Sequence, residues 1–350
     1  MNLDLNTVWF LLVVALLAGY AVLDGFDLGV GALHLFARKD EHRRALIKAI
    51  GPVWDGNEVW LVVGGGALFA AFPEVYATAF SGFYTAFILL LFALIFRAVS
   101  IEFRNQRESG VWRRGWDVGF SLGSIAAALL AGVALGNIAC GIPLNEQHEF
   151  TGNFLTLLRP YPLLVGLTGL ALFALHGALY ITLKTEGELQ SQARGWAKKA
   201  SIIFVLGYIL MVLATMKYAR PMIHPFVRHP WLFIVPLITV LALYNILKGI
   251  KLRQDYRAFR ASCVMIIALM IRFGIGMFPQ LILSKPNIAN SLDIYNAASS
   301  TKTLKTMLII ALIGMPLVIA YTVWIYRVFR GKVDADADVD ADAEGKEGGY

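Results

Sequence analysis

The sequence is poor in charged residues. They make up 16% of its 350 residues, whereas apolar residues make up 58%. An ordinary soluble domain contains about 25% charged residues and less than half apolar residues. This composition excludes a disordered chain, a fibrous repeat and a small disulfide-stapled module. Because apolar runs of about 18 residues or more recur along the chain, the sequence predicts an integral membrane protein.

Residue types that could hold a redox centre are also scarce. The two cysteines, Cys140 and Cys263, are expected near opposite membrane surfaces, about 30 Å apart, and so cannot form a disulfide. His176 is the one histidine of six expected deep in the membrane, whereas a heme in a helix bundle takes ligands from facing helices. The sequence contains no Walker motif, nucleotide fingerprint or cysteine cluster. We therefore expect no redox centre, no metal site and no nucleic-acid partner for this chain.

Nine apolar windows of about 20 residues predict nine transmembrane helices. They lie near residues 8–34, 46–72, 75–98, 117–140, 161–183, 200–217, 230–248, 260–283 and 304–328. The connections on one side of the membrane, with the segment after the ninth helix, contain 22 Lys and Arg residues, and those on the other side contain seven. Since Lys and Arg concentrate in cytoplasmic loops, we expect the N-terminus outside and the C-terminus in the cytoplasm.

The predicted fold is an all-α integral membrane protein. A short internal echo, Leu23-Asp24-Gly25 in the first helix and Leu175-His176-Gly177 in the fifth, favours two four-helix bundles plus one peripheral helix. Residues 1–330 then form one transmembrane domain. Asp and Ala alternate in residues 331–350, which cannot bury a core and are expected to form a disordered acidic cytoplasmic tail.

Ionisable side chains at membrane depth are the strongest functional signal in the sequence. Such groups cost at least about 2–3 kcal/mol each at a helix centre, so they are rarely present without a role. Four carboxylates form two pairs, and the two members of each pair are three residues apart and so lie on one face of a helix. The helix rise of about 1.5 Å per residue places these four carboxylates and one arginine at a similar depth in the membrane. These residues are Asp24 and Asp27, Asp55 and Glu58, and Arg272.

Two interpretations of this layer remain open. In the structural one, paired and hydrogen-bonded groups fix the packing of the helices, with Arg272 as the counter-ion of one carboxylate. In the functional one, burial and crowding favour the protonated form of the carboxyl groups, which then relay protons at neutral pH. His34 lies seven residues after Asp27, on the same face and at the cytoplasmic edge where protons would enter. Nearby Trp54 and Trp60 are typical of packing elements or membrane anchors.

The segments that carry the carboxylates resemble subunit II of cytochrome bd quinol oxidases. The matching motifs are GYAVLDGFDLG at residues 19–29, GPVWDGNEVW at 51–60 and GGALFAAFP at 65–73. FSGFY at residues 80–84 and Phe96-Arg97 continue the match, which is strong over residues 15–105 and diffuse to about residue 330. The nine predicted helices and the outer N-terminus agree with this family.

The resemblance implies a membrane-bound terminal oxidase that oxidises quinol and reduces O₂ to water. In this family two b-type hemes and one d-type heme belong to subunit I, and subunit II is its heme-free partner in a pseudo-symmetric heterodimer. Some members hold a structural quinone on subunit II, and small single-span subunits and lipid are further partners. Such a complex lies in the cytoplasmic membrane of a bacterium or archaeon.

For individual residues, the resemblance places Asp55 on a proton path from the cytoplasm, with Asp24 and Asp27 in the same region. We therefore expect a proton path and a structural polar cluster around it. The path contains Asp24, Asp27, His34, Asp55 and Glu58, and the polar cluster contains Trp54, Asn57, Trp60, Arg97 and Arg272.

A stand-alone proton-coupled secondary transporter is the main alternative. Paired carboxylates at mid-depth, glycine-rich helices and an internal echo suit a transporter equally well, so the choice for an oxidase depends on the motifs.

Overall fold

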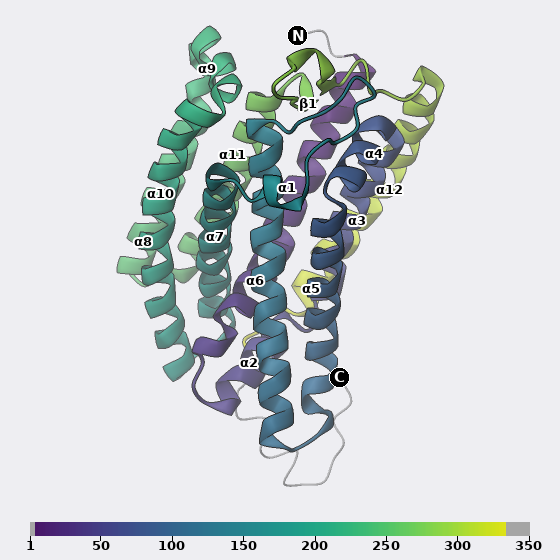
Figure 1. The fold of residues 1–350 in the computed structure, drawn as a ribbon. Coiled ribbons are helices and arrows are strands. Elements are labelled where there is room, and N and C mark those ends of the chain that lie inside the picture. Colours follow the sequence, from purple (N-terminus) through teal and green to yellow (C-terminus); the bar gives the residue numbers. More distant parts are fainter. Residues whose placement is uncertain (1–3, 334–350) are drawn as a thin grey trace.

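Helices make up most of residues 4–333, the part of the chain that the computed structural model describes (Figure 1). The α-helices are α1 (Leu5–Leu33), α2 (Asp40–Ile50), α3 (Trp54–Ala71), α4 (Pro73–Gly82), α5 (Tyr84–Phe103), α6 (Gly110–Cys140), α7 (Pro160–Lys184), α8 (Gly187–Tyr218), α9 (His224–Arg228), α10 (Ile234–Lys251), α11 (Asp255–Met277) and α12 (Thr301–Val328). Short 3-10 turns are η1 (His34–Phe36), η2 (Arg104–Gln106), η3 (Phe154–Leu157), η4 (Arg220–Ile223), η5 (Pro230–Phe233) and η6 (Ile288–Asn290). Strands β1 (Gln280–Ile282) and β2 (Leu292–Asp293) form an antiparallel hairpin.

Local sequence signals set where the long helices begin. The side chain of Asp4 accepts a hydrogen bond from the backbone N–H of Thr7 at 2.8 Å, which caps α1. Ser300 caps α12 in the same way through the N–H of Thr303 at 3.2 Å. Pro160 occupies the first position of α7, where its missing N–H costs nothing.

Eight of the helices are long and apolar enough to cross a membrane, among the described residues. The ninth expected span, 46–72, is interrupted. Pro52 cannot continue α2, so the chain starts again at Trp54 as α3, whose first turns carry the polar residues of the motif. The fold is therefore a mostly helical membrane protein, and a ninth membrane crossing by α3 stays a prediction.

Two other expected spans also differ from the helices observed. The span at 75–98 consists of α4 and α5, which are separated at Phe83. The span at 260–283 is too long, because α11 ends at Met277 and Pro279 leads into β1. The tail predicted at 331–350 lies outside the described residues from position 334 onward.

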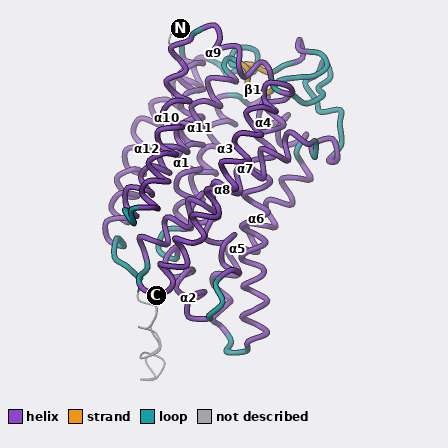
Figure 2. The backbone as a smooth tube through the Cα atoms, turned by 90° about the vertical axis from the view of Figure 1, so that its left-hand side faces the viewer, coloured by secondary structure: helices purple, strands orange, loops and turns teal. Residues whose placement is uncertain are grey.

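Helix α1 lies at the centre of the molecule. It packs against α3, α6, α7 and α11, while α5 packs on α6, α8 on α7 and α10 on α11. Because α1 contacts helices from both halves of the chain, a division into two four-helix bundles stays a prediction. Figures 1 and 2 show the long helices running roughly side by side, with β1, α4 and α9 at the end where the described chain begins. We call this the N-terminal end, and the opposite end, with α2, the basic end.

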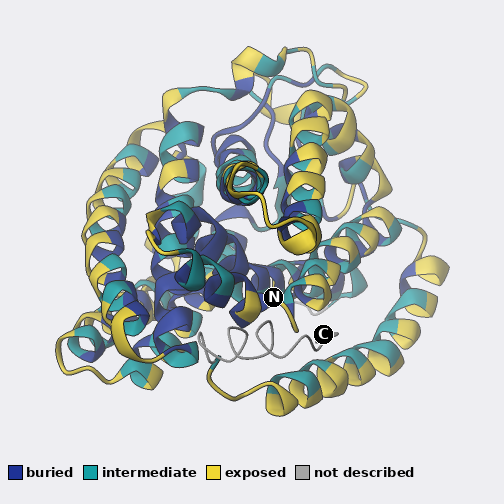
Figure 3. Cartoon of the chain, turned by 90° about the horizontal axis from the view of Figure 1, so that it is seen from below, coloured by how far each residue is buried: buried dark blue, intermediate teal, exposed yellow. Residues whose placement is uncertain are grey.

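Two glycines let α1 and α7 approach closely. A Cβ atom on Gly29 would lie 1.8 Å from the carbonyl oxygen of Phe173, and one on Gly177 would lie 2.5 Å from the carbonyl carbon of Gly29. No larger side chain fits at this crossing. Buried residues gather in the interior of the molecule, and the helices at its periphery carry most of the exposed residues (Figure 3). Many of these exposed residues are large and apolar. The apolar window of α12 has no buried residue, so this helix is the most loosely packed of the eight.

Candidate functional site

The two carboxylates of α1 lie in the interior of the bundle. Asp24 and Asp27 are both fully buried, and their spacing of three residues puts them on one face of the helix. Uncompensated carboxylates at this depth would be very costly, so their partners define the site. We call Asp24, Asp27, Asn57, Glu58 and Arg97 the carboxylate cluster.

Arg97 is the cation of the carboxylate cluster. Its guanidinium comes from α5 and is fully buried, with Nη2 3.0 Å from Oδ1 of Asp24 and Nη1 bonded to Oε1 of Glu58. The ring of Trp54 lies 6.0 Å from the same guanidinium. One arginine thus bridges a carboxylate of α1 and a carboxylate of α3.

Asn57 connects the cluster to α12. Its amide Nδ2 donates to Oδ2 of Asp27 at 2.7 Å and to the carbonyl oxygen of Leu23 at 3.2 Å. Its Oδ1 accepts a hydrogen bond from the hydroxyl of Tyr326 at 3.0 Å. Tyr326 was not among the expected site residues, and no motif in the sequence pointed to it.

The remaining motif residues lie at the edge of the cluster. Asp55 is exposed in the first turn of α3, one turn before Glu58, whose side chain is 23% exposed. Trp60 packs on α1 at Gly19, where a Cβ atom would lie 2.4 Å from the indole ring. The carboxylates therefore run from the surface at Asp55 to the interior at Asp24 and Asp27.

The structure places Arg272 away from the carboxylate cluster. Its guanidinium lies 6.0 Å from the ring of Tyr208, and no carboxylate of residues 4–333 is within ion-pairing distance of it. The expectation that Arg272 is the counter-ion does not match this geometry. Arg272 lies five residues before Met277, where α11 ends near the N-terminal end, and faces α8. Arg97 lies six residues before Phe103, where α5 ends near the basic end, and faces α1 and α3.

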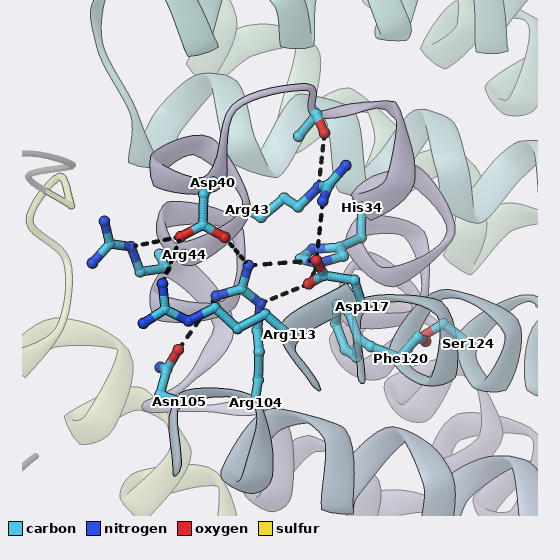
Figure 4. A network of polar contacts seen from close by, with 11 residues as sticks. His34, Asp40, Arg43, Arg44, Arg104, Asn105, Arg113, Asp117, Phe120 and Ser124 are labelled. Atoms are coloured by element: carbon cyan, nitrogen blue, oxygen red, sulfur yellow. Dashed lines mark hydrogen bonds and ion pairs between the residues drawn. The ribbon is translucent and has the colours of Figure 1, made fainter. Parts of the chain in front are cut away.

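A second polar network holds the basic end together. At its centre Asp117 of α6 is fully buried and bonds Nε2 of His34 at 2.7 Å, Nε of Arg104 at 2.6 Å and Nη1 of Arg43 at 3.1 Å (Figure 4). Arg104 also bonds Asp40 of α2 at 2.5 Å. His34 is thus bound into an ion cluster between α1, α2, α5 and α6. We call this the Asp117 network.

A further ion pair, at the surface of the basic end, connects the segment after α1 to the start of α8. Nζ of Lys39 lies 2.6 Å from a carboxylate oxygen of Glu188, which raises the pKa of Lys39 above its ordinary value. Neither Asp117 nor Arg104 was an expected site residue. The signal that could have found Asp117 is a lone carboxylate near the start of an apolar run.

We expect Asp117→Asn to destabilise the protein strongly. The change leaves the guanidinium of Arg104, which is fully buried, facing an amide instead of a carboxylate, and breaking a buried ion pair in this way costs about 3 kcal/mol or more. The midpoint of thermal unfolding, followed on the purified protein, should fall. The matched control is Asp255→Asn, whose partly exposed pair with Arg194 should be worth about 1 kcal/mol or less. Equal effects for both variants would contradict the prediction.

Both ring nitrogens of His176, the deep histidine, have hydrogen-bond partners within the chain. Its Nδ1 lies 2.7 Å from Oγ of Ser262 and its Nε2 lies 3.0 Å from the carbonyl oxygen of Val22, while its ring stacks on Phe259. Across residues 4–333, no group of three or more His, Cys, Asp or Glu side chains is placed to bind a metal ion. The two cysteines are not bonded to each other.

A large apolar cavity lies toward the N-terminal end. It has a volume of about 1150 Å³ and opens between α1, α9 and α11. Aromatic and aliphatic side chains line most of it, and a few polar groups join them. The lining includes Phe10, Trp231, Phe278, His224 and Gln280.

The fold and the site define a class of protein: a multi-pass helical membrane protein with buried carboxylates arranged around one arginine. Comparison with known proteins identifies the family within this class. The family model for cytochrome bd terminal oxidase subunit II matches residues 5–329. The chain is 37% identical to cytochrome bd-I ubiquinol oxidase subunit 2 of Escherichia coli (strain K12), covering 94% of this chain and 95% of the relative.

Two further comparisons agree. Cytochrome bd ubiquinol oxidase subunit 2 of Bacillus subtilis (strain 168) is 36% identical, with 94% of this chain and 97% of the relative covered. The structure of bd oxidase from Geobacillus thermodenitrificans shares the fold, with a TM-score of 0.77 at 16% identity, covering 93% of this chain and 98% of that one. The chain belongs to the cytochrome bd terminal oxidase subunit II family. It is therefore a subunit of an oxidoreductase complex of the respiratory chain, and the comparisons give no support to a stand-alone transporter.

Proposed function

We propose that this chain is the heme-free partner of a heme-carrying subunit I in a quinol oxidase of the bacterial cytoplasmic membrane. The complex oxidises quinol and reduces O₂ to water, with two b-type hemes and one d-type heme in the other subunit. His176 supports the heme-free assignment, because both of its ring nitrogens already have hydrogen-bond partners. Neither nitrogen is open to bind iron.

The exposed face of α3 supports a partner on this side of the molecule. Asp55 is exposed there, and an exposed carboxylate beside lipid is costly. Gly56, Gly65 and Gly66 leave open space where a side chain would project, which would let another helix approach closely. A second membrane subunit covering this face would shield Asp55 from lipid and pack against the glycines.

We also propose that Asp55 and Glu58 of α3 and the buried Asp24 and Asp27 of α1 conduct protons from the cytoplasm. The distribution of Lys and Arg supports a cytoplasmic basic end, which puts Asp55 on the cytoplasmic side of the cluster. The observation that carries the proposal is the continuous series of acidic groups. Asp55 leads in one helical turn to Glu58, and Glu58 shares Arg97 with the buried Asp24.

His34 has a different place in this scheme. His34 bonds the carboxylate of Asp117, and that carboxylate is already paired with the guanidinium groups of Arg43 and Arg104. Two fixed cations beside His34 oppose the passage of a proton. We propose that His34 fixes the end of α1 and that protons are taken up at Asp55. The structural quinone held by some members of the family would fit the cavity between α1, α9 and α11, whose apolar lining with a few polar groups suits a ring and a long tail.

Asp55→Asn tests the proton path. The amide keeps the shape of the side chain but cannot carry a proton, so O₂ consumption per heme should fall by about tenfold or more. The heme spectrum of the complex, isolated through a tag on this chain, should be unchanged. Glu146→Gln, an exposed carboxyl-to-amide change, serves as the control and should leave turnover unaltered.

The other outcomes separate the alternatives. Loss of hemes and of the partner subunit, with normal turnover in what remains, would show that Asp55 is a structural group only. Normal turnover with normal heme content would show that protons do not pass through Asp55.

A further inference from the structure

The hydrogen bonds of Asn57 have a fixed direction. Two acceptors, the carbonyl oxygen of Leu23 and Oδ2 of Asp27, lie on one side of its amide group, so the NH₂ must face them. The carbonyl oxygen of the amide then faces the hydroxyl of Tyr326, which donates to it at 3.0 Å. The chain of donors therefore runs from Tyr326 through Asn57 to Asp27.

This direction determines which oxygen of Asp27 carries a proton. Oδ2 accepts a hydrogen bond from Asn57, and the carbonyl oxygen of a protonated carboxyl group is a better acceptor than its hydroxyl oxygen, so protonation at Oδ2 would weaken this bond. Oδ1 is buried and has no hydrogen-bond partner among the described residues. A proton taken up by Asp27 therefore binds at Oδ1, where no neighbouring group retains it.

The reverse orientation of Asn57 would retain the proton. A rotated amide would present its oxygen to Asp27 and accept a hydrogen bond from a protonated Oδ2, which stabilises the protonated form. Tyr326 opposes this rotation: its oxygen could accept from the NH₂ group, but its own proton would lose the acceptor that it has in the structure. The carbonyl oxygen of Leu23 opposes it as well.

We propose that Tyr326 is a positioning residue of the proton path: by holding the amide of Asn57 in one orientation, it keeps the proton of Asp27 on Oδ1 and free to move on. The inference rests on the proposed role of Asp27 in proton conduction. It also gives α12 a function, since this loosely packed helix meets the carboxylate cluster through Tyr326.

The other charged and titratable groups around Asp27 come from four helices and stay in place when Tyr326 is changed. They are Asp24 on α1, Glu58 on α3, Arg97 on α5 and Tyr180 on α7. Tyr180 donates its hydroxyl to the carbonyl oxygen of Ala49 and not to Asp27. A change in the pH dependence of a Tyr326 variant would therefore come from the orientation of Asn57.

Tyr326→Phe tests the inference in the purified complex. The phenyl ring keeps the packing against Phe26 but removes the hydroxyl. Turnover per heme should fall about fivefold, the effect of one hydrogen bond. The alkaline limb of the turnover–pH profile should move to higher pH by about one unit, because the rotated amide stabilises protonated Asp27.

Tyr321→Phe is the matched control. It makes the same change on the same helix at a residue that is 60% exposed, and it should leave turnover and the pH profile unaltered. The infrared band of the Asp27 carboxyl group, identified by its loss in Asp27→Asn, should shift in Tyr326→Phe and stay in place in Tyr321→Phe.

Three results would contradict either the role of Tyr326 or the proton path itself. A lower turnover of Tyr326→Phe with an unchanged pH profile and infrared band would overturn the inference and leave Tyr326 a packing role. Normal turnover and profile in Tyr326→Phe, together with a severe loss in Asp27→Asn, would also overturn the inference and leave the proton path standing. Normal turnover in Asp27→Asn would overturn the path itself.

Discussion

Replacement of Arg97 by methionine should prevent accumulation of the assembled protein. Methionine fills a similar volume but leaves Asp24 and Glu58 without their shared cation. Removing one partner of a buried ion pair costs about 3–5 kcal/mol, and here two carboxylates lose the same partner. Since native proteins are stable by only about 5–15 kcal/mol, most of the stability margin is lost. The yield of tagged protein from membranes and its bound heme content measure the effect.

Arg272→Met is the matched control for this prediction. Arg272 is also an arginine of a long apolar helix but has no carboxylate partner in the described chain, so its replacement should leave yield and heme content close to normal. Combining Arg97→Met with Asp24→Asn and Glu58→Gln removes the uncompensated charges and should restore part of the yield. If the triple variant accumulates no better than Arg97→Met alone, the loss comes from packing rather than from charge.

The two arginines also show what a single sequence can determine about this site. The spacing of Asp24 and Asp27, the position of the acidic pair in α3 and the rise per residue were enough to place four carboxylates at similar depths. The depth of Arg272 was misjudged, because the expected span began near residue 260 whereas α11 begins at Asp255, which moves Arg272 toward the N-terminal end. Arg272 was therefore assigned to the cluster as counter-ion, and Arg97, counted among the cytoplasmic basic residues, is fully buried beside Asp24.

Contacts between distant segments were the least predictable part. Tyr326 meets Asn57 across 269 positions of the chain, and Asp117 meets His34 across 83. An aromatic residue near the end of an apolar helix is typical of a membrane anchor, so its sequence context gives no sign of a buried hydrogen bond. The fold class, by contrast, follows from composition and the length of apolar runs. The helix breaks at Pro52 and Phe83 were missed, because hydropathy averaged over a window does not register a single residue that ends a helix.

Asp27→Asn should greatly lower turnover while leaving the complex intact. The asparagine can still accept the hydrogen bond from Asn57 through its own carbonyl oxygen, so the contact between α1 and α3 persists. It also removes one negative charge from a cluster that holds three carboxylates and one arginine, which relieves repulsion. Assembly and heme content should therefore be normal or improved.

Proton conduction, unlike assembly, requires a carboxyl group at position 27. An amide has no site for the transferred proton, so O₂ consumption per heme should fall by about two orders of magnitude, the range expected when a positioned acid–base group is lost. Asp117→Asn gives the complementary result: lower thermal stability with normal turnover per heme, because the Asp117 network holds helices and lies outside the proposed path. Asp27→Asn and Asp117→Asn together thus distinguish residues that conduct protons from residues that only stabilise the fold. Normal turnover in Asp27→Asn would show that the carboxylate cluster is a structural device, and proton uptake would then have to take place outside this subunit's buried carboxylates.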